Sequence, residues 1–368
     1  MKKVGLFCLA FLLLISVFCI AGFKKNESQE KDKGKDPKRG YGIVSPTLSP
    51  DNKKIMLVVC HEGICDLAVY EVATGRMVRF HPSSDKSNGA PSYSSDSKKI
   101  TFTSGDFGDN YNIHLMNIDG SGLRQLTHDY NDGKTKDGPD VVVKLNAVPS
   151  FSTDGKRIVY IKSGIKRVLY RSGRQILHWD VYEADVDTGK ERRLTNYRFF
   201  HIAGRPAYMP DGKRFIFSGE GAKNHTDIGP KDFEAYMKLY KQNNIFIMDG
   251  TKNALEPAFT YGDWTQEPSV AKDGTILFMA RTCTQKDKKS VCTYDLFSRR
   301  GNEIKAVTNK RFSRMAQPRI SFDGTHAVFL ASRWEGAGPS LFITRLDGSE
   351  LRYFELPPWE SIKEVRHP

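Results

Sequence analysis

The stretch "PSFSTDGKRIVYIKS" (residues 149–163) joins a proline, a Ser-Thr-Asp-Gly turn and an alternating Arg-Ile-Val-Tyr-Ile run. Proline lacks the N–H that a central strand needs, so we expect Pro149 to begin a short strand or to lie in an edge strand. The Asp154-Gly155 pair is typical of a tight turn, because the aspartate accepts backbone N–H groups and glycine tolerates positive φ. The β-branched and aromatic run that follows is typical of a second strand. The stretch therefore predicts a β-hairpin.

The same pattern occurs six times along the chain. In every copy a proline is followed five residues later by an aspartate, and the copies start 45, 58, 57, 62 and 50 residues apart. This period is larger than a helical repeat and close to one four-stranded propeller blade. The copies are "PTLSPDNKKIMLV" from Pro46, "PSYSSDSKKITFT" from Pro91, "PSFSTDGKRIVYI" from Pro149, "PAYMPDGKRFIFS" from Pro206, "PSVAKDGTILFMA" from Pro268 and "PRISFDGTHAVFL" from Pro318.

Each hairpin is followed by a third apolar run, such as "NIHLMNI", and by a turn and a short fourth run, such as "IDGSG" and "LRQLT". Four antiparallel strands in six copies predict an all-β chain, a six-bladed β-propeller over residues 42–368 with blades starting near 42, 87, 145, 202, 264 and 314. A β-sandwich also needs many short strands, but strict repetition without a linker-like break disfavours it. The one helical candidate, residues 231–242, is expected as an insertion in blade four.

The N-terminus indicates export. After Lys2 and Lys3, the twenty residues from Val4 to Phe23 carry no charge, which is typical of a signal peptide or of a membrane anchor over residues 1–23. Lipidation at Cys19 is a third alternative. Residues 24–41 are almost free of apolar side chains and are expected to form a flexible polar tether. We therefore expect an exported protein of the periplasm or cell envelope. Any contact with the membrane is expected through this N-terminal segment only.

The remaining cysteines support an oxidising compartment. Cys60 with Cys65, and Cys283 with Cys292, each flank a short polar loop between two strand-like runs, where facing residues approach closely enough for a disulfide. A zinc site is the alternative for the first spacing, but no nearby His or Cys pair completes a tetrahedron. We expect two local disulfides, and no metal ion or cofactor.

The repeats resemble those of the TolB-like six-bladed propeller family, whose units carry a proline, a Ser-Pro-Asp-Gly-like turn, an apolar strand and a late "Asp-Gly…Leu-Thr" ending. The resemblance covers roughly residues 42–357. It implies the propeller fold and is less informative about function, since some peptidases and lyases carry similar propellers. TolB has an α/β domain before its propeller, whereas only the apolar segment and the tether precede the first blade here, so we expect a propeller-only relative.

The strand order distinguishes two faces. The Asp turns and the third-to-fourth turns lie on one face, the turn face; the second-to-third loops and the connections between blades lie on the other, the loop-rich face. Nearly all length variation, and both cysteine pairs, fall on the loop-rich face, which favours it for binding.

The residues before the prolines are expected to begin the innermost strands and to ring the channel mouth on the loop-rich face. In blades one to three these residues are Ser45, Ala90 and Val148. In blades four to six they are Arg205, Glu267 and Gln317, which form a polar half of the rim, and His201, Trp264 and Trp334 are expected nearby. A charged group beside an aromatic suits a peptide terminus, a carboxylate or a sugar. The alternative is that Arg205 and Glu267 pair across blades and simply close the channel.

Other functional classes find little support. Of the net charge of +13, residues 1–41 contribute +5, and no basic stripe with interleaved aromatics indicates nucleic acid. The Asp-rich stretch 129–140 lacks the spacing of a calcium loop, and no G-x-S-x-G or H-E-x-x-H motif is present. We expect a monomeric binding or scaffolding module for a protein segment or envelope polymer; a propeller-based hydrolase or lyase acting on peptide or glycan at the channel mouth is the alternative.

Overall fold

The computed structural model of the chain describes residues 40–80, 82, 86–105, 111–129, 145–166, 176–195, 201–220, 243–251, 254–259, 261–262, 264–286, 289–333 and 338–365. The apolar N-terminal segment, the helical candidate at 231–242, Trp334 and the Asp-rich stretch beyond Asp129 lie outside these residues. Within the described part, no helix has the length and apolarity needed to cross a membrane.

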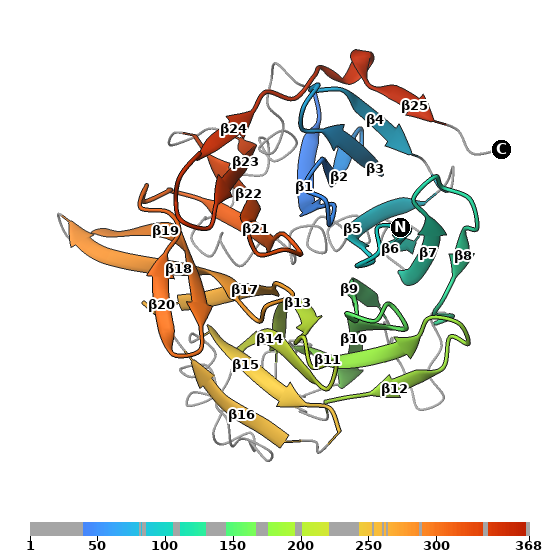
Figure 1. Cartoon of the computed structure of the whole chain (residues 1–368), viewed down its shortest axis with the longest axis horizontal. Coiled ribbons are helices and arrows are strands. Elements are labelled where there is room, and N and C mark those ends of the chain that lie inside the picture. Colours follow the sequence, from blue (N-terminus) through green and yellow to red (C-terminus); the bar gives the residue numbers. More distant parts are fainter. Residues whose placement is uncertain are drawn as a thin grey trace.

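Six β-sheets surround a central axis (Figure 1), and in each sheet the strands follow one another in chain order. Blade one holds β1 (Gly42–Leu48), β2 (Lys54–His61), β3 (Ile64–Glu71) and β4 (Met77–Phe80); blade two holds β5 (Ser87–Tyr93), β6 (Lys99–Gly105), β7 (Asn112–Asn117) and β8 (Arg124–Gln125); blade three holds β9 (Asn146–Phe151), β10 (Arg157–Lys166), β11 (Ile176–Asp185) and β12 (Glu191–Arg193). Blade four holds β13 (His201–Tyr208), β14 (Arg214–Glu220), β15 (Asn243–Asp249) and β16 (Ala254–Phe259); blade five holds β17 (Trp264–Val270), β18 (Ile276–Lys286), β19 (Lys289–Arg300) and β20 (Glu303–Ala306); blade six holds β21 (Met315–Ile320), β22 (His326–Ser332), β23 (Pro339–Arg345) and β24 (Arg352–Phe354). The expected six-bladed propeller of four-stranded antiparallel blades is confirmed.

The core lies between neighbouring blades. One cluster joins Met56 and Leu67 of blade one to Phe102 and Met116 of blade two. Equivalent clusters connect the other blades, because each sheet presents apolar side chains to the sheet on either side. The first strands of adjacent blades contact one another around the whole ring, including β1 with β21.

The repeat prolines lie inside the first strands. Strand β1 begins at Gly42, so Ser45 does not begin the strand as expected from the sequence. In all six blades the pairing between first and second strands shifts register at the proline. A β-bulge places the proline on the unpaired edge facing the channel, where its missing N–H costs no ladder bond.

The Asp turns have the expected hydrogen bonds. At the turn between β9 and β10, the Lys156 N–H donates to Asp154 Oδ1 over 3.1 Å, and the Ser152 hydroxyl donates to the same oxygen over 2.5 Å. Asp51, Asp96 and Asp323 accept from a serine hydroxyl in the same way. These aspartates hold the turns together.

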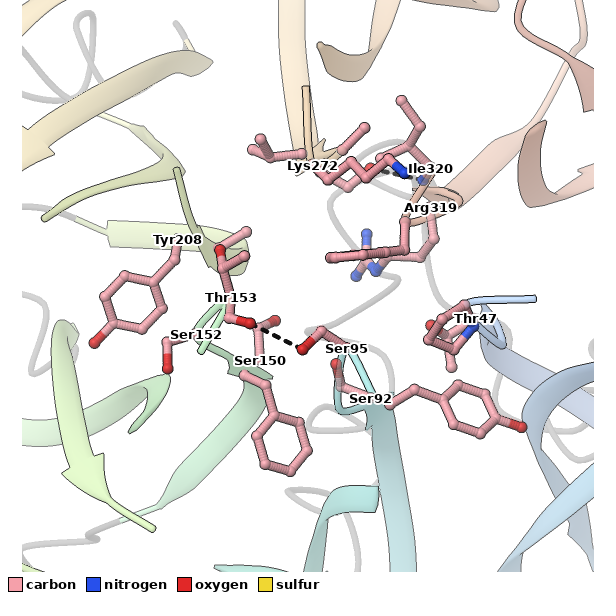
Figure 2. A pocket seen from close by; sticks show the side chains of 18 of the residues that line it. Thr47, Ser92, Ser95, Ser150, Ser152, Thr153, Tyr208, Lys272, Arg319 and Ile320 are labelled. Carbon is pink, nitrogen blue, oxygen red and sulfur yellow. Dashed lines mark hydrogen bonds between the residues drawn. The ribbon is translucent and has the colours of Figure 1, made fainter. Parts of the chain in front are cut away.

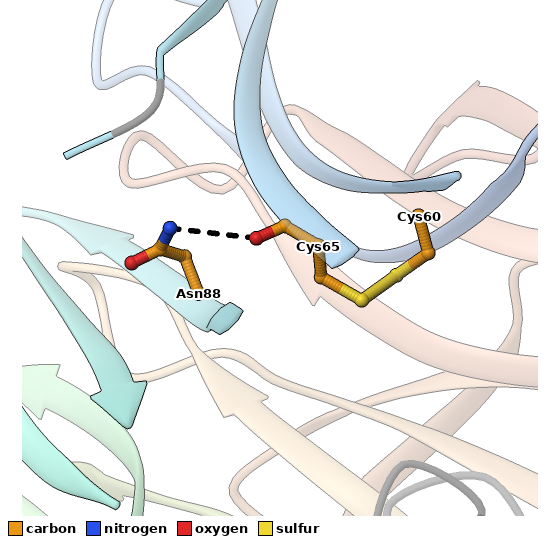
Figure 3. The surroundings of a disulfide bond; sticks show 3 residues. All are labelled: Cys60, Cys65 and Asn88. Atoms are coloured by element: carbon orange, nitrogen blue, oxygen red, sulfur yellow. Dashed lines mark hydrogen bonds between the residues drawn. A yellow bond between two sulfur atoms is a disulfide. The ribbon is translucent and has the colours of Figure 1, made fainter. Parts of the chain in front are cut away.

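Both expected disulfides are present. Cys60 and Cys65 face one another across β2 and β3 with their Cα atoms 4.1 Å apart, and Cys283 and Cys292 do so across β18 and β19 at 4.0 Å. Beside the first bridge, the Asn88 amide of blade two lies 3.4 Å from the Cys65 carbonyl (Figure 3). Both bridges hold hairpins on the loop-rich face.

A C-terminal segment joins the last blade to the first. Beyond β24, the Tyr41 hydroxyl donates to the Pro357 carbonyl over 2.9 Å, and the Trp359 ring stacks on His61 with centroids 4.5 Å apart. Strand β25 (Lys363–Val365) then pairs in parallel with β4, so blade one has a fifth strand. The segment after blade six therefore helps to close the ring by contacting and pairing with blade one.

Candidate functional site

A funnel opens at the propeller axis on the turn face, with a volume of about 860 Å³ when the part open to solvent is included. Two rings of equivalent repeat positions line it (Figure 2). The inner ring consists of the residues directly after the repeat prolines: Thr47, Ser92, Ser150, Ala207, Ser269 and Arg319. The mouth ring consists of the residues four after the prolines: Pro50, Ser95, Thr153, Pro210, Lys272 and Phe322.

The blades hold the mouth ring together. The Ser95 hydroxyl of blade two donates to the Thr153 carbonyl of blade three over 2.8 Å, and the Lys272 N–H of blade five donates to the Phe322 carbonyl of blade six over 2.9 Å. These bonds join turns that are far apart in sequence. The opening therefore has a defined shape set by ring closure.

The charged side chains that line the funnel are basic, whereas the turn aspartates directly follow the mouth-ring residues in the sequence without lining the funnel. Among the described residues that line it, the charged side chains are Arg205, Lys272 and Arg319, and none of the lining residues is acidic. Lys272 is exposed at the mouth, whereas the two arginines are buried, with 4% and 7% of their surface exposed. A buried guanidinium keeps its charge at a high desolvation cost, so its neighbours decide what the site attracts.

Arg205 reaches from blade four towards blade two. Its Nη1 donates to the Pro91 carbonyl over 2.8 Å, and its Nε has no hydrogen-bond partner. Burial and the nearby Arg319 charge lower the pKa of Arg205 well below its usual value, and Glu267 acts in the opposite direction.

Arg319 supplies the second buried cation. Its Nη1 lies 3.4 Å from Glu267 Oε2 of blade five and donates to the Pro318 carbonyl over 2.6 Å. Burial lowers the pKa of Arg319, although the Glu267 carboxylate opposes the shift. Two buried cations are therefore accompanied by one carboxylate in this part of the channel wall.

The polar residues that the sequence suggests for the site lie buried in the wall of the channel. Glu267 and Gln317 are buried, with 8% and 2% of their surface exposed. The salt bridge of Glu267 is to Arg319 and not to Arg205, which corrects the pairing considered from the sequence. Gln317 Oε1 accepts the Ser45 N–H over 2.6 Å and so links blade six to blade one.

The aromatic candidates are placed less centrally. Trp264 begins β17, its Nε1 donates to Gln266 Oε1 over 2.8 Å, and the Arg281 guanidinium lies 4.8 Å from its ring centroid. His201 is the first residue of β13, and its backbone lies opposite that of Glu220 in the β13–β14 pairing. Trp334 lies outside the described residues.

Two funnel residues, Arg319 and Lys272, were not singled out from the sequence. A signal for Arg319 was available: the other five repeats have Thr, Ser, Ser, Ala and Ser directly after the proline. At this repeat position Arg319 is therefore the one charged residue among small ones. Lys272 differs similarly from the residues at its position.

The loop-rich face presents apolar side chains on its two disulfide-bonded hairpins. Ile64 lies between Cys60 and Cys65 and is 51% exposed, and Val291 lies beside Cys292 and is 45% exposed. The hairpin of β18 and β19 is also among the longest in the propeller, with strands of 11 and 12 residues. The large insertions after blade two and in blades three and four lie mostly outside the described residues.

Comparison with known proteins gives partial matches in sequence, and no family model matches. The chain is 26% identical over 214 residues to the uncharacterized peptidase YuxL of Bacillus subtilis, which covers 53% of this chain and 32% of YuxL. It is 32% identical over 110 residues to the Tol-Pal system protein TolB of Francisella tularensis, which covers 30% of this chain and 19% of TolB. The chain thus spans about a third or less of the length of these curated relatives.

Solved structures share the fold. The structure of TolB from Acinetobacter baumannii aligns with 86% of this chain and with 64% of the TolB chain. The TM-score of this alignment is 0.54, and the two sequences are 18% identical. The structure of oligogalacturonate lyase from Vibrio parahaemolyticus aligns with 83% of this chain and with 78% of the lyase chain. The TM-score of this alignment is 0.50, and the two sequences are 10% identical. At such identities the likeness concerns the fold alone. Together with the sequence match, it confirms the resemblance to TolB-like six-bladed propellers.

Proposed function

We propose that this TolB-like propeller is an exported, non-catalytic binding module that engages a protein partner through its loop-rich face. The apolar segment at residues 4–23 and the two disulfides support export, because disulfides persist in oxidising compartments. The similarity to a protein named as part of the Tol-Pal system supports a protein partner over an envelope polymer.

The observation that carries the proposal is the pair of exposed aliphatic side chains held on disulfide-bonded hairpins. Single exposed apolar residues are common on protein surfaces. Ile64 and Val291, however, belong to tips whose backbone is restrained by a cross-strand disulfide. Restrained tips lose little conformational entropy when a partner binds, which favours recognition by packing.

Capture of partners by the full chain, with crosslinking and mass spectrometry in its native host, tests the proposal. We expect Ile64→Glu and Val291→Glu each to reduce recovery of the partner at least tenfold, because a charge is then placed in an apolar contact. Leu123→Glu is the matched control, since Leu123 is 44% exposed but lies on the turn face between β7 and β8. Equal recovery with all three variants would contradict the proposed face.

A hydrolase or lyase acting on peptide or glycan is the second candidate, favoured by the similarity to YuxL, which is named as a peptidase. The described lining of the funnel contains no His, Cys, Asp or Glu, so a general acid or base within that lining would have to be Lys272, Tyr93 or Tyr208. Turnover of a peptide or glycan panel that is lost in His201→Ala or Arg205→Ala would favour this candidate over the binding module.

A further inference from the structure

We propose that the funnel on the turn face is a binding site for an oxyanion, a ligand that carries carboxylate or phosphate oxygens. The site is built from the inner ring, the mouth ring and Arg205. The site lies on the face opposite the proposed partner surface. The test of this site is therefore independent of the test of the proposed function.

Electrostatics select an anion. Three cationic side chains line the funnel, the described lining includes no carboxylate, and Glu267 is the acidic group beside the buried arginines. The Glu267 carboxylate is 3.4 Å from Arg319, which leaves Arg205 without a carboxylate at hydrogen-bond distance among its described contacts. Two buried cations with one carboxylate leave a net positive charge in the channel wall, and a buried charge attracts an opposite charge more strongly than it would in bulk solvent.

Donor chemistry selects oxygen ligands. Guanidinium groups present N–H donors in a planar fork that matches the oxygens of carboxylates and phosphates. Four inner-ring residues, Thr47, Ser92, Ser150 and Ser269, add hydroxyls around the same axis. Ser269 Oγ already accepts the Ile320 N–H over 3.0 Å, so its hydroxyl hydrogen is left to donate.

The lining favours a small molecule or a chain end. The mouth ring contributes the apolar surfaces of Pro50, Pro210 and Phe322 beside the ammonium of Lys272. A ligand with a short carbon skeleton and an anionic end fits both rings.

Isothermal titration calorimetry of the full chain with inorganic phosphate and with succinate, at ionic strength held constant with sodium chloride, tests the site. We expect saturable binding of at least one probe, and which probe binds distinguishes a phosphate from a carboxylate source. Lys272→Met and Arg319→Met should each weaken binding at least tenfold.

Lys98→Met is the matched control, since Lys98 is an exposed lysine of the blade two Asp turn that does not line the funnel. It should change affinity less than twofold. Because Lys272 is exposed, Lys272→Met keeps the test decisive even if Arg319→Met does not fold. No binding of either probe, or equal weakening in Lys98→Met and Lys272→Met, would overturn the proposal.

Discussion

At the scale of single residues, several residues of the channel wall have a positive φ, a backbone conformation that residues other than glycine rarely adopt. Ser45, Ala90, Val148, Glu267 and Gln317, each before a repeat proline, have φ between 46° and 56°. In blade four the positive φ of 92° falls on Gly204 instead. Such conformations cost about 1–3 kcal/mol each and persist only where the surrounding structure imposes them. Here the repeated bulge imposes them.

Gly204 cannot be replaced without cost. A Cβ at this position would lie 2.5 Å from Ser218 Oγ, in a backbone with φ of 92°. We expect Gly204→Ala to lower the free energy of unfolding by about 3 kcal/mol, from strain and overpacking together. Gly89→Ala is the control, since nothing lies within 4 Å of its Cβ position. Urea denaturation measures both, and similar losses would contradict the steric explanation.

The buried pair of Glu267 and Arg319 permits a second test at this scale. Glu267→Gln leaves buried cations without their carboxylate and should lower the free energy of unfolding by about 3 kcal/mol. The double variant Glu267→Gln/Arg319→Met removes one of the cations too and should recover part of that loss. A double variant less stable than Glu267→Gln, measured by urea denaturation, would show that the loss comes from packing.

At the scale of elements, each blade begins with a hairpin held by one aspartate. The turns are local, and the lowered pKa values of Asp51, Asp96, Asp154, Asp211, Asp273 and Asp323 show that the folded turn favours the carboxylate. For Asp323, burial raises the pKa, but hydrogen bonds from Ser321, Thr325 and Asn52 outweigh it and lower the value to about 2.

These turns predict sensitivity to acid. A carboxylate whose pKa is lower in the folded state stabilises the fold above its unfolded value, near 4, and this contribution is lost as pH falls towards the folded value. We expect the free energy of unfolding to fall between about pH 4 and pH 2, and Asp323→Asn to be less stable at neutral pH with a shallower acid dependence. Denaturant unfolding at a series of pH values measures this; an unchanged slope in Asp323→Asn would contradict the role of Asp323.

The disulfides of the two disulfide-bonded hairpins are expected to contribute to the free energy of unfolding. Closing loops of this length stabilises a fold by about 2–3 kcal/mol in the chain-entropy description. Cys60→Ser/Cys65→Ser should therefore lower the free energy of unfolding by about 2 kcal/mol, with hydrogen exchange increasing in β2 and β3 first. No change in either measurement would show that the strand pairing alone holds the tip.

At the scale of the whole molecule, ring closure depends on contacts between the two ends of the propeller. The C-terminal segment places Trp359 against Tyr41 and His61, and Arg79 contacts both the Trp359 ring and Glu364. Ile362 is buried in the cluster that joins blades six and one. This segment therefore adds to the interface between blade six and blade one.

Loss of this contact should loosen one interface of the ring. We expect Trp359→Ala to lower the free energy of unfolding by about 2 kcal/mol, because a half-buried aromatic leaves the Tyr41 and His61 contacts unfilled. Hydrogen exchange should increase in β4 and β25 before other strands. Tyr353→Ala, an exposed aromatic on β24, is the control, and an equal loss there would contradict a specific role in closure.

The sequence alone determined the blade. Proline, Asp turn and strand periodicity act within a few residues, so six copies predicted six four-stranded sheets, and directly opposed cysteines predicted the disulfides. Only the tertiary structure decided the site. Arg205 donates to the Pro91 carbonyl and Gln317 accepts from the Ser45 N–H, pairs 114 and 272 residues apart. Local pattern specifies each blade, but ring closure brings the blades' side chains together at the axis, and no local pattern encodes those contacts.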